Sequence, residues 1–409
     1  MQGFKKLAIG VATLLVIIAA VRLAGQSNTS SGQPAGAPPR GPERESLDMY
    51  FPGTEPLAPD EMRVISCGTG MPTAQKAQAA TSFLVELGNG NKFIFDIGTE
   101  SAGNLGCLNI PYDYLDKVFL SHLHTDHAGD LAALWVGGWI SGRHGPLHVW
   151  GPSGPTPDLG TKAFIDNFQK LWKWDHVSRL GHVPTSGGAI EAHEFDYRGM
   201  NQVVYEGNGV TIRSWPAIHC LDGPVSYALY WNGFKFVFGG DTFPNKWYIK
   251  YAKDADLAIH ECFPTPPMLM KYQHLSAASA LTIATDVHAV PKTFGMVMEQ
   301  VKPRMAVAFH FNNTVATRYP IYDGIRETYR GPLTMAADLL CWNISKKDIR
   351  VRRVIIDEAA TAADSPLPRQ RPDPKARAKF SSFVDSGRLD VKEVIGPEIE
   401  RFKKEHNLK

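Results

Sequence analysis

The sequence lacks the features that mark several common protein classes. Its five cysteines, Cys67, Cys107, Cys220, Cys262 and Cys341, show no C-x-x-C spacing, which argues against a cysteine-rich zinc site or a thioredoxin-like redox motif. It also lacks an excess of one charge, because 43 Lys and Arg face 41 Asp and Glu. The net charge of +2 gives no general argument for nucleic-acid binding. An apolar content of 44% excludes wholesale disorder.

The apolar run near the start of the chain falls short of the roughly 20 residues that a membrane-spanning helix needs. Residues 7–21 form a run of 15 residues behind the basic pair Lys5 and Lys6, and small residues follow at 24–25. This layout predicts an export signal over residues 1–25, either cleaved or retained as an inner-membrane anchor, and a periplasmic location. Residues 26–59 are rich in Ser, Gly and Pro and are predicted to be a flexible linker.

The C-terminal end also differs from the middle of the chain. Residues 359–409 are predicted to form a linker and a helical tail, because apolar residues from Phe380 to Phe402 are spaced like one face of two short helices. From residue 365 onward, eleven Lys and Arg stand against seven Asp and Glu. A basic face toward lipid headgroups or an acidic partner is one interpretation, and a helix pair docked on the main domain is the preferred one. Residues 60–358 then form one large domain.

Short strands and helical stretches are mixed in that domain. Residues 83–87 and 92–96 predict a β-hairpin, and Asn232-Gly233 marks a second tight turn between two strands. Helical stretches at 128–139 and 162–171 lie among the strands, which predicts sheets covered by helices.

The segment from 151 to 207 is dense in aromatic residues. These side chains predict either an aromatic substrate pocket or, as the preferred interpretation, the buried side of a helix. The helix interpretation depends on the four-residue spacing of Phe164, Phe168 and Trp172.

The residues that carry chemistry begin at His122. The run His122-Leu-His124-Thr-Asp126-His127 follows an apolar strand and precedes a helical stretch, so it is predicted to lie at the carboxyl edge of a sheet. Imidazole and carboxylate suit Zn²⁺ and its neighbours in the first transition row. His122 and His124 can face one ion, and Asp126 and His127 can face a second. Without a metal, this group would crowd a core with polar side chains that need partners.

This H-x-H-x-D-H run resembles the hallmark of the metallo-β-lactamase superfamily, and the resemblance extends from about residue 63 to about residue 356. It implies an α/β fold, namely an αβ/βα four-layer sandwich of two mixed β-sheets flanked by helices. Later motifs match in order, in Ser-Trp-Pro-Ala-Ile-His219, Gly-Gly-Asp241-Thr and Val-Ala-Phe-His310. The resemblance implies the following ligands: His122, His124 and His219 for one metal, Asp126, His127 and His310 for the second, and Asp241 as the bridge.

The same resemblance implies a hydrolase with two divalent metal ions, Zn²⁺ first and Mn²⁺ or Fe²⁺ as alternatives. Water held between two ions about 3.5–4 Å apart ionises far more readily than bulk water and can attack as metal-bound hydroxide. Asp126 is expected to orient this nucleophile. Asp96, in Phe-Asp-Ile-Gly, is expected to orient the ligand loop.

Within the superfamily, the pattern looks most like the ribonuclease Z and arylsulfatase-like branch, which includes guanitoxin-biosynthesis-type hydrolases. The bridging position of Asp241 disfavours the true β-lactamases, which generally lack it. Residues 259–262, Ile-His-Glu-Cys, resemble a strand of that branch that ends in His-Glu. His260 and Glu261 therefore either support the metal site, which is the preferred interpretation, or only end a strand.

Two further positions of that branch match in part. His288 lies where ribonuclease Z-like members place a catalytic histidine, and it is the candidate proton donor to the leaving group. It is followed by Ala-Val rather than Ser-Thr, and His274 is the rival candidate. Arg318 is the candidate contact for an anionic substrate, although it follows His310 at a greater distance than in ribonuclease Z.

These patterns predict an enzyme that cleaves an ester-type bond in a small molecule. An anionic ester, either a phosphodiester or a sulfate, is the first substrate class, and a lactone or other carboxylic ester is the alternative. No nucleic-acid partner is expected, because the 22 positions between His219 and Asp241 leave no room for the exosite arm of tRNA-processing members. A non-catalytic binding protein is disfavoured by the full ligand set. A diiron redox enzyme is disfavoured because its flavin domain and extra carboxylate are missing. The oligomeric state stays open.

Overall fold

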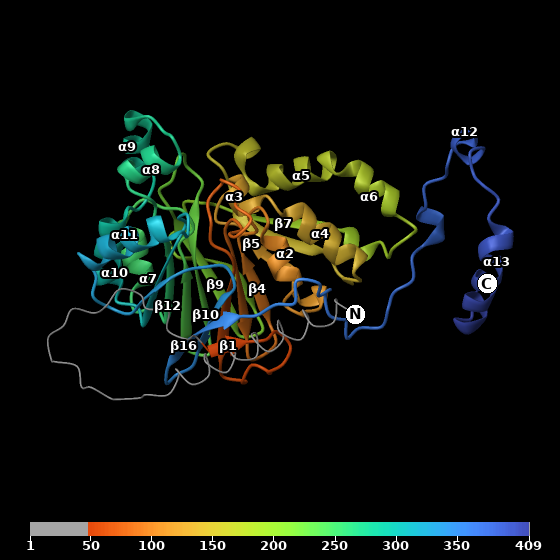
Figure 1. Ribbon diagram of the computed structural model, residues 1–409, viewed down its shortest axis with the longest axis horizontal. Helices are drawn as coiled ribbons and strands as arrows, with labels where there is room; N and C mark the ends of the chain where they lie inside the picture. The colour runs from red at the N-terminus through yellow and green to blue at the C-terminus, as the bar shows by residue number, and fades with distance from the viewer. Residues whose placement is uncertain (1–47, 409) are drawn as a thin grey trace, which may run out of the picture. The chain divides into compact units, whose positions relative to one another are not determined.

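The computed structural model describes residues 48–408. Two mixed β-sheets face each other, and helices cover the outer face of each sheet (Figure 1). The predicted four-layer α/β sandwich is thereby confirmed. The predicted export signal at residues 1–25 and the linker up to residue 47 lie outside the described residues.

The first sheet has nine strands, and those from β4 to β7 run parallel to one another. In spatial order the strands are β1 (Asp48–Tyr50), β16 (Ile349–Val354), β15 (Leu340–Ile344), β2 (Met62–Gly68), β3 (Ser82–Leu87), β4 (Lys92–Phe95), β5 (Lys117–Phe119), β6 (Leu147–Pro152) and β7 (Ile190–Phe195).

The second sheet has seven strands, and those from β11 to β14 run parallel. In spatial order they are β14 (Leu333–Met335), β13 (Met305–Phe309), β12 (Leu257–Glu261), β11 (Phe234–Phe238), β10 (Val225–Trp231), β9 (Val210–Pro216) and β8 (Gln202–Gly207). In both sheets, the parallel strands bring their carboxyl ends to one edge, which is where ligands bind in many α/β proteins.

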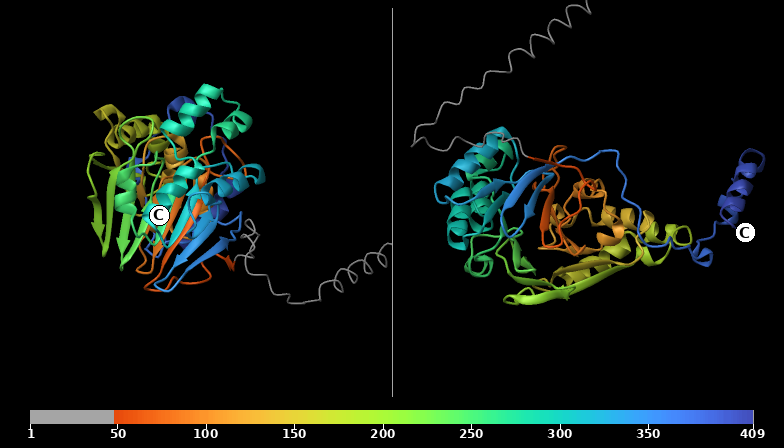
Figure 2. Two further views of the ribbon diagram at one scale, coloured as in Figure 1. Left: turned by 90° about the vertical axis from the view of Figure 1, so that its left-hand side faces the viewer. Right: turned by 90° about the horizontal axis from the view of Figure 1, so that it is seen from below.

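The helices fall into two groups along the chain (Figure 2). The helices that follow strands of the first sheet are α2 (Ser101–Gly106), α3 (Thr125–Ala128), α4 (Leu131–Ile140), α5 (Thr161–Leu171) and α6 (Lys173–Arg179). Those that follow strands of the second sheet are α7 (Lys246–Ala252), α8 (Pro266–Tyr272), α9 (Ala277–Asp286), α10 (Pro291–Val301) and α11 (Val315–Arg326).

Apolar clusters hold the layers together. Between the sheets, aromatic rings interdigitate, as where Phe83 meets Phe309 edge-on at 5.4 Å between ring centroids. Trp135 of α4 and Phe168 of α5 pack on the outer face of the first sheet, and Phe294 of α10 packs on that of the second. Each such buried ring contributes roughly 1.5–3 kcal/mol of transfer free energy, so the sandwich is a well-filled frame for the strand ends.

Local turn chemistry sets the register of the predicted hairpins. Asn232 and Gly233 both take positive φ angles, of 50° and 70°, and join β10 to β11 as an antiparallel pair. Two successive left-handed residues match the twist of the flanking strands, which is why Asn-Gly is favoured there. The hairpin of β3 and β4 is also present. Both predicted hairpins are confirmed.

The fold begins earlier than the predicted linker boundary at residue 59. β1 pairs in parallel with β16, and its last residue, Tyr50, is buried. Arg63 donates to the Tyr50 hydroxyl at 2.7 Å, and its guanidinium carbon lies 4.1 Å from the ring centroid. These contacts anchor a strand too short to show any periodic pattern in the sequence.

The C-terminal tail forms two helices, as predicted, α12 (Ser382–Asp385) and α13 (Lys392–Glu405). Neither has a buried residue, and the side chain of Phe383 is 86% exposed. The preferred prediction of a helix pair docked on the main domain is therefore wrong. The linker before them does contact the domain, where Ser186 donates to Gln370 at 2.7 Å.

The described residues also bear on membrane-spanning helices and on the state of the cysteines. None of the helices that the structure describes is both long and apolar enough to cross a bilayer. All five cysteines carry free thiols.

Candidate metal centre

The histidine motif lies on the turn that joins β5 to α4. His122 and His124 stand on an extended stretch, and Asp126 and His127 belong to the single turn of α3. The carbonyls of Asp126 and His127 accept hydrogen bonds from Thr81 (3.0 Å) and Ile97 (2.8 Å). These bonds tie the motif to the loops that follow neighbouring strands, so the motif is held at the carboxyl edge of the first sheet.

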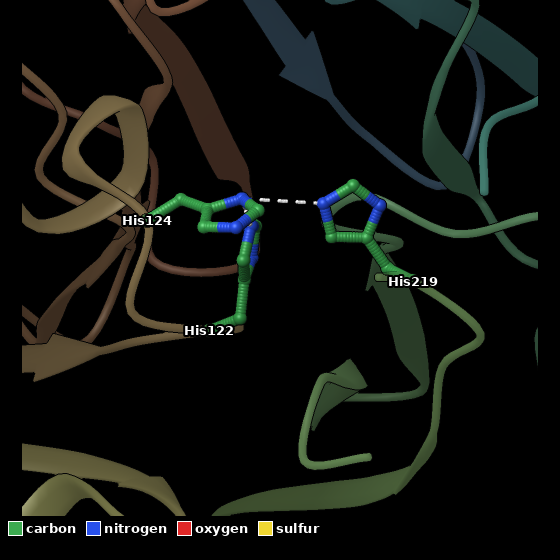
Figure 3. A group of neighbouring side chains, drawn as sticks. All are labelled: His122, His124 and His219. Atoms are coloured by element: carbon green, nitrogen blue, oxygen red, sulfur yellow. Dashed lines mark hydrogen bonds between the residues drawn. The ribbon is translucent and has the colours of Figure 1, made fainter. Parts of the chain in front are cut away.

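One cluster of ligand atoms consists of three histidines, shown in Figure 3. His124 Nδ1 lies 3.0 Å from His122 Nε2 and 3.2 Å from His219 Nε2. His219 comes from the loop between β9 and β10, far along the chain from the other two. Burial lowers the pKa of His219 to about 4 and lowers that of His122 well below its ordinary value, so both rings offer neutral lone pairs.

A second cluster of ligand atoms lies beside the first and contains Asp126, His127, Asp241 and His310, all of them buried. His310 Nε2 lies 3.1 Å from Asp126 Oδ2 and 3.2 Å from Asp241 Oδ2. His127 Nε2 lies 3.4 Å from Asp241 Oδ1. Asp241 Oδ2 also lies 3.8 Å from His219 Nε2, so this carboxylate reaches both clusters.

Asp241 owes its position to the glycine before it. Gly240 follows β11 with a φ of 60°, and a Cβ atom there would lie 2.6 Å from Ser121 Cβ. Only glycine allows this approach between the loops after β11 and β5. The Gly-Gly-Asp sequence is therefore required for the two sheets to share one site.

The charges of the second cluster fit divalent cations. Among the described residues, no Lys or Arg pairs with Asp126 or Asp241. Burial alone would lower the pKa of His127, but Asp241, Asp126 and Asp96 raise it well above its ordinary value. Two buried polar atoms that face the clusters also lack a hydrogen-bond partner, namely Asp241 Oδ1 and His127 Nε2. Metal ions would satisfy such atoms and supply the missing positive charge.

Asp96 supports the ligand loop from beneath. It accepts hydrogen bonds from His127 Nδ1 (2.6 Å), from the Ser121 amide (2.6 Å) and from the Ser121 hydroxyl (2.7 Å). These contacts fix the orientation of the His127 ring and leave Nε2 to face the cluster. Sequence reasoning missed Ser121, although it directly precedes the first histidine of the motif.

His288 and Glu261 lie beside the clusters as a contacting pair. His288 Nδ1 lies 2.7 Å from Glu261 Oε2, and the Thr242 amide donates to Glu261 Oε1 (2.6 Å). The His288 ring stacks on Phe263, and its centroid lies 4.8 Å from that of His219. The contact from Glu261 to His288 was not foreseen, because the two residues belong to separate elements.

Three other candidates lie apart from the clusters. His274 is exposed after α8 and joins none of the ligand groups of the described residues. The His260 ring packs edge-on against Tyr248, with 4.6 Å between centroids, on the helix side of the sheet. Its assignment to the metal site is wrong, since neighbouring residues of a strand face opposite sides and Glu261 takes the site side.

Arg318 is the third of these candidates. Its guanidinium donates to Asn313 Oδ1 (3.2 Å) and to the Met335 carbonyl (3.3 Å). It is not among the residues that line the cavity at the metal centre. The contact of Arg318 with an anionic substrate stays a prediction.

A cavity of about 360 Å³ opens onto the three-histidine cluster. Its walls are the loop from 152 to 160, the start of α5 and the loop from 219 to 224. Leu159, Phe164 and Leu221 give it an apolar lining, and Asp158 and Asp222 are its charged residues besides the histidines. The prediction that Phe164, Phe168 and Trp172 form the buried side of a helix is therefore confirmed only in part. Phe168 is buried, but Phe164 lines the cavity and Trp172 is exposed.

Comparisons with known proteins agree with this geometry. Residues 108–311 match the family described as a beta-lactamase superfamily domain, and residues 62–146 match that described as anti-Pycsar protein Apyc1. Ribonuclease Z of Mycolicibacterium gilvum is 27% identical over 205 residues, which are 49% of this chain and 68% of that protein.

Solved structures show the same fold. The metallo-beta-lactamase fold protein YhfI from Bacillus subtilis has a TM-score of 0.52 at 20% identity, with 70% of this chain and 100% of that chain covered. The short form of human tRNase Z has a TM-score of 0.50 at 16% identity, with 68% and 98% covered.

Proposed function

Because this chain belongs to the metallo-β-lactamase superfamily, on its ribonuclease Z branch, we propose that it hydrolyses an ester bond with two divalent metal ions. The family and the ligand clusters support a metal-binding hydrolase in general. The observation that carries the finer proposal is the convergence of seven side chains from four chain segments into two clusters that share Asp241. We propose Zn²⁺ as the metal, since imidazole and carboxylate ligands suit it, with Mn²⁺ or Fe²⁺ as alternatives.

The residues of the chain then have separate tasks. Bound metal ions supply a water of lowered pKa and stabilise the negative charge that develops during hydrolysis. Asp126 has one carboxylate oxygen, Oδ1, without a hydrogen-bond partner and is proposed to orient the attacking water. His288, held through Nδ1 by Glu261, is proposed to give a proton to the leaving group.

The charge of the cavity lining indicates which kind of ester the cavity can accept. It has no Lys or Arg in its lining, so an anionic group beyond the scissile one would meet only Asp158 and Asp222. We therefore propose a phosphodiester or sulfate with one negative charge at the metals and an uncharged, largely apolar organic group in the cavity. A lactone or other carboxylic ester is the second candidate, and the apolar lining from Leu159, Phe164 and Leu221 favours it.

A substrate panel tests this proposal on the full chain loaded with Zn²⁺. The panel contains bis(4-nitrophenyl) phosphate, 4-nitrophenyl sulfate, a nitrophenyl carboxylic ester, a lactone and a β-lactam. The proposal expects kcat/KM to be highest for one of the monoanionic esters and to vanish in Asp126→Ala. Highest turnover of the carboxylic ester or lactone would select the second candidate. Turnover of none, with metal bound, would favour a binding protein.

Export to the periplasm is a separate proposal that depends on the residues before 26. Fractionation of a bacterial host that expresses the full chain tests it. Recovery in the periplasm or the inner membrane is expected, and recovery in the cytoplasm alone would contradict it.

A further inference from the structure

A third group of ligating side chains lies on β6 and β7, apart from the candidate metal centre. His148 Nδ1 lies 3.0 Å from His193 Nε2 and 3.4 Å from Glu191 Oε2. All three ligand atoms lie within 4.8 Å of one another. We propose that His148, Glu191 and His193 bind one divalent transition-metal ion, in addition to the ions at the main centre.

The strand register brings these side chains to one face. β6 and β7 are parallel, with His148 opposite Glu191 and Trp150 opposite His193. Side chains two residues apart on a strand share a face, so all four point the same way. Trp150 belongs to the cluster between the sheets, so the group lies where that inner face meets solvent. His148 is about 13 Å along β6 from Pro152, which lines the main cavity.

A stack of rings fixes the orientation of His193. Phe119 stacks on Trp150 with 4.8 Å between centroids and a tilt of 6°, and Trp150 stacks on His193 at 4.3 Å and 14°. The three rings lie on the neighbouring strands β5, β6 and β7. A ring held in this way loses little further freedom when it binds a ligand, so the site is preorganised.

The spacing and charge suit a metal ion. Nitrogen and oxygen ligands about 2.0–2.2 Å from Zn²⁺ stand about 3.0–3.4 Å apart at angles near 90–110°. Lys117, beside His148 in the sheet, is paired with Asp116 at 2.6 Å. Glu191 is exposed, so water can complete the coordination.

An ion at this site would stabilise part of the wall of the main cavity. Glu194, next to His193, accepts the Lys162 amide (2.8 Å) at the start of α5, and the Phe195 carbonyl accepts the Ser153 amide (2.7 Å). β7 is the last strand of the nine-stranded sheet, so it has one strand neighbour. Linking β7 to β6 through an ion would stabilise the strand that holds the loop from 152 to 160 and the start of α5.

Metal stoichiometry tests the proposal. The full chain is dialysed to equilibrium over a range of free Zn²⁺, and bound zinc per chain is measured by elemental analysis. His193→Gln and His148→Gln should each bind one ion fewer than the unchanged chain. His182→Gln, which alters an exposed histidine outside the group, should bind the full number. Equal stoichiometry in all four proteins would overturn the proposal, as would an equal loss in His182→Gln.

Copper spectroscopy identifies the ligands independently of hydrolysis. Cu²⁺ added to the chain loaded with only two zinc ions per chain should give an electron paramagnetic resonance signal with nitrogen coupling, and His193→Gln should lose it. Asp241→Asn should keep that signal, because it changes the main centre only. A signal unchanged in His193→Gln would overturn the assignment, whatever happens at the main centre.

Discussion

The metal centre and the cavity beside it are built in different ways. Apart from His124, the ligands of the centre are buried, and they stand directly after strands or in the one turn of α3. The cavity wall consists of loops, and its apolar side chains Leu159 and Leu221 are 51% and 54% exposed. The strand ends that carry the ligands (the frame) therefore fix the chemistry. The loops of the cavity wall decide which organic group reaches the metal centre.

The largest expected effect lies in the frame. Asp241→Ala removes the carboxylate that reaches both clusters, and hydrolysis should fall by more than about a hundredfold, since even supporting residues at metal sites cost 10–100-fold. Turnover of the best substrate and circular dichroism check the activity and the fold. Asp323→Ala, an exposed aspartate on α11, should behave like the unchanged chain. Retained activity in Asp241→Ala would refute the shared site.

His288→Gln tests the residue that lies beside the two ligand clusters and contacts Glu261. If His288 protonates the leaving group, the loss should be about a hundredfold for an alkyl ester and small for a nitrophenyl ester, whose leaving group needs no proton. The ratio of kcat for the two esters measures this difference. Equal losses would remove the proposed proton donor and leave a positioning role.

Asp96→Asn weakens the support beneath the ligand loop. It should lower metal affinity by about 10–100-fold, because the His127 ring would lose its carboxylate acceptor. Activity should recover as free Zn²⁺ is raised, which distinguishes this change from loss of a ligand. A titration of activity against free Zn²⁺ that matches the unchanged chain would show that Asp96 has no such role.

Leu221→Lys changes the cavity and should have the smallest effect. An added cation is expected to raise kcat/KM for an anionic ester up to about fivefold relative to an uncharged ester, as for a weak exposed ion pair. Leu221→Gln is the matched uncharged control. A gain of the same size in the glutamine variant would mean that charge in the cavity does not govern the choice of substrate.

Much of this frame could be predicted from the sequence, because its signals are local. Asn232-Gly233 specifies a turn, and H-x-H-x-D-H places four ligands on one short stretch. The family resemblance of this motif also indicated which distant residues are the other ligands. The structure then brings His219, Asp241 and His310 to it.

The sequence could not show what depends on contacts between distant segments. The sequence motif favoured both His260 and Glu261 as support for the metal site. Adjacent residues of a strand face opposite sides of the sheet, so only one of the two can face the site. No pattern in the sequence predicted β1, whose stability comes from the contact of Tyr50 with Arg63. The cavity loops have no periodic pattern, so their lining became visible only in three dimensions.

Metal content measured together with activity tests the central claim most directly. The full chain is stripped with a chelator and then titrated with Zn²⁺. Bound zinc and ester hydrolysis are followed in three proteins, namely the unchanged chain, Asp241→Ala and His193→Gln. We predict no hydrolysis without metal, and full activity in His193→Gln when about two ions are bound per chain. Undiminished hydrolysis by the metal-free chain would contradict the account.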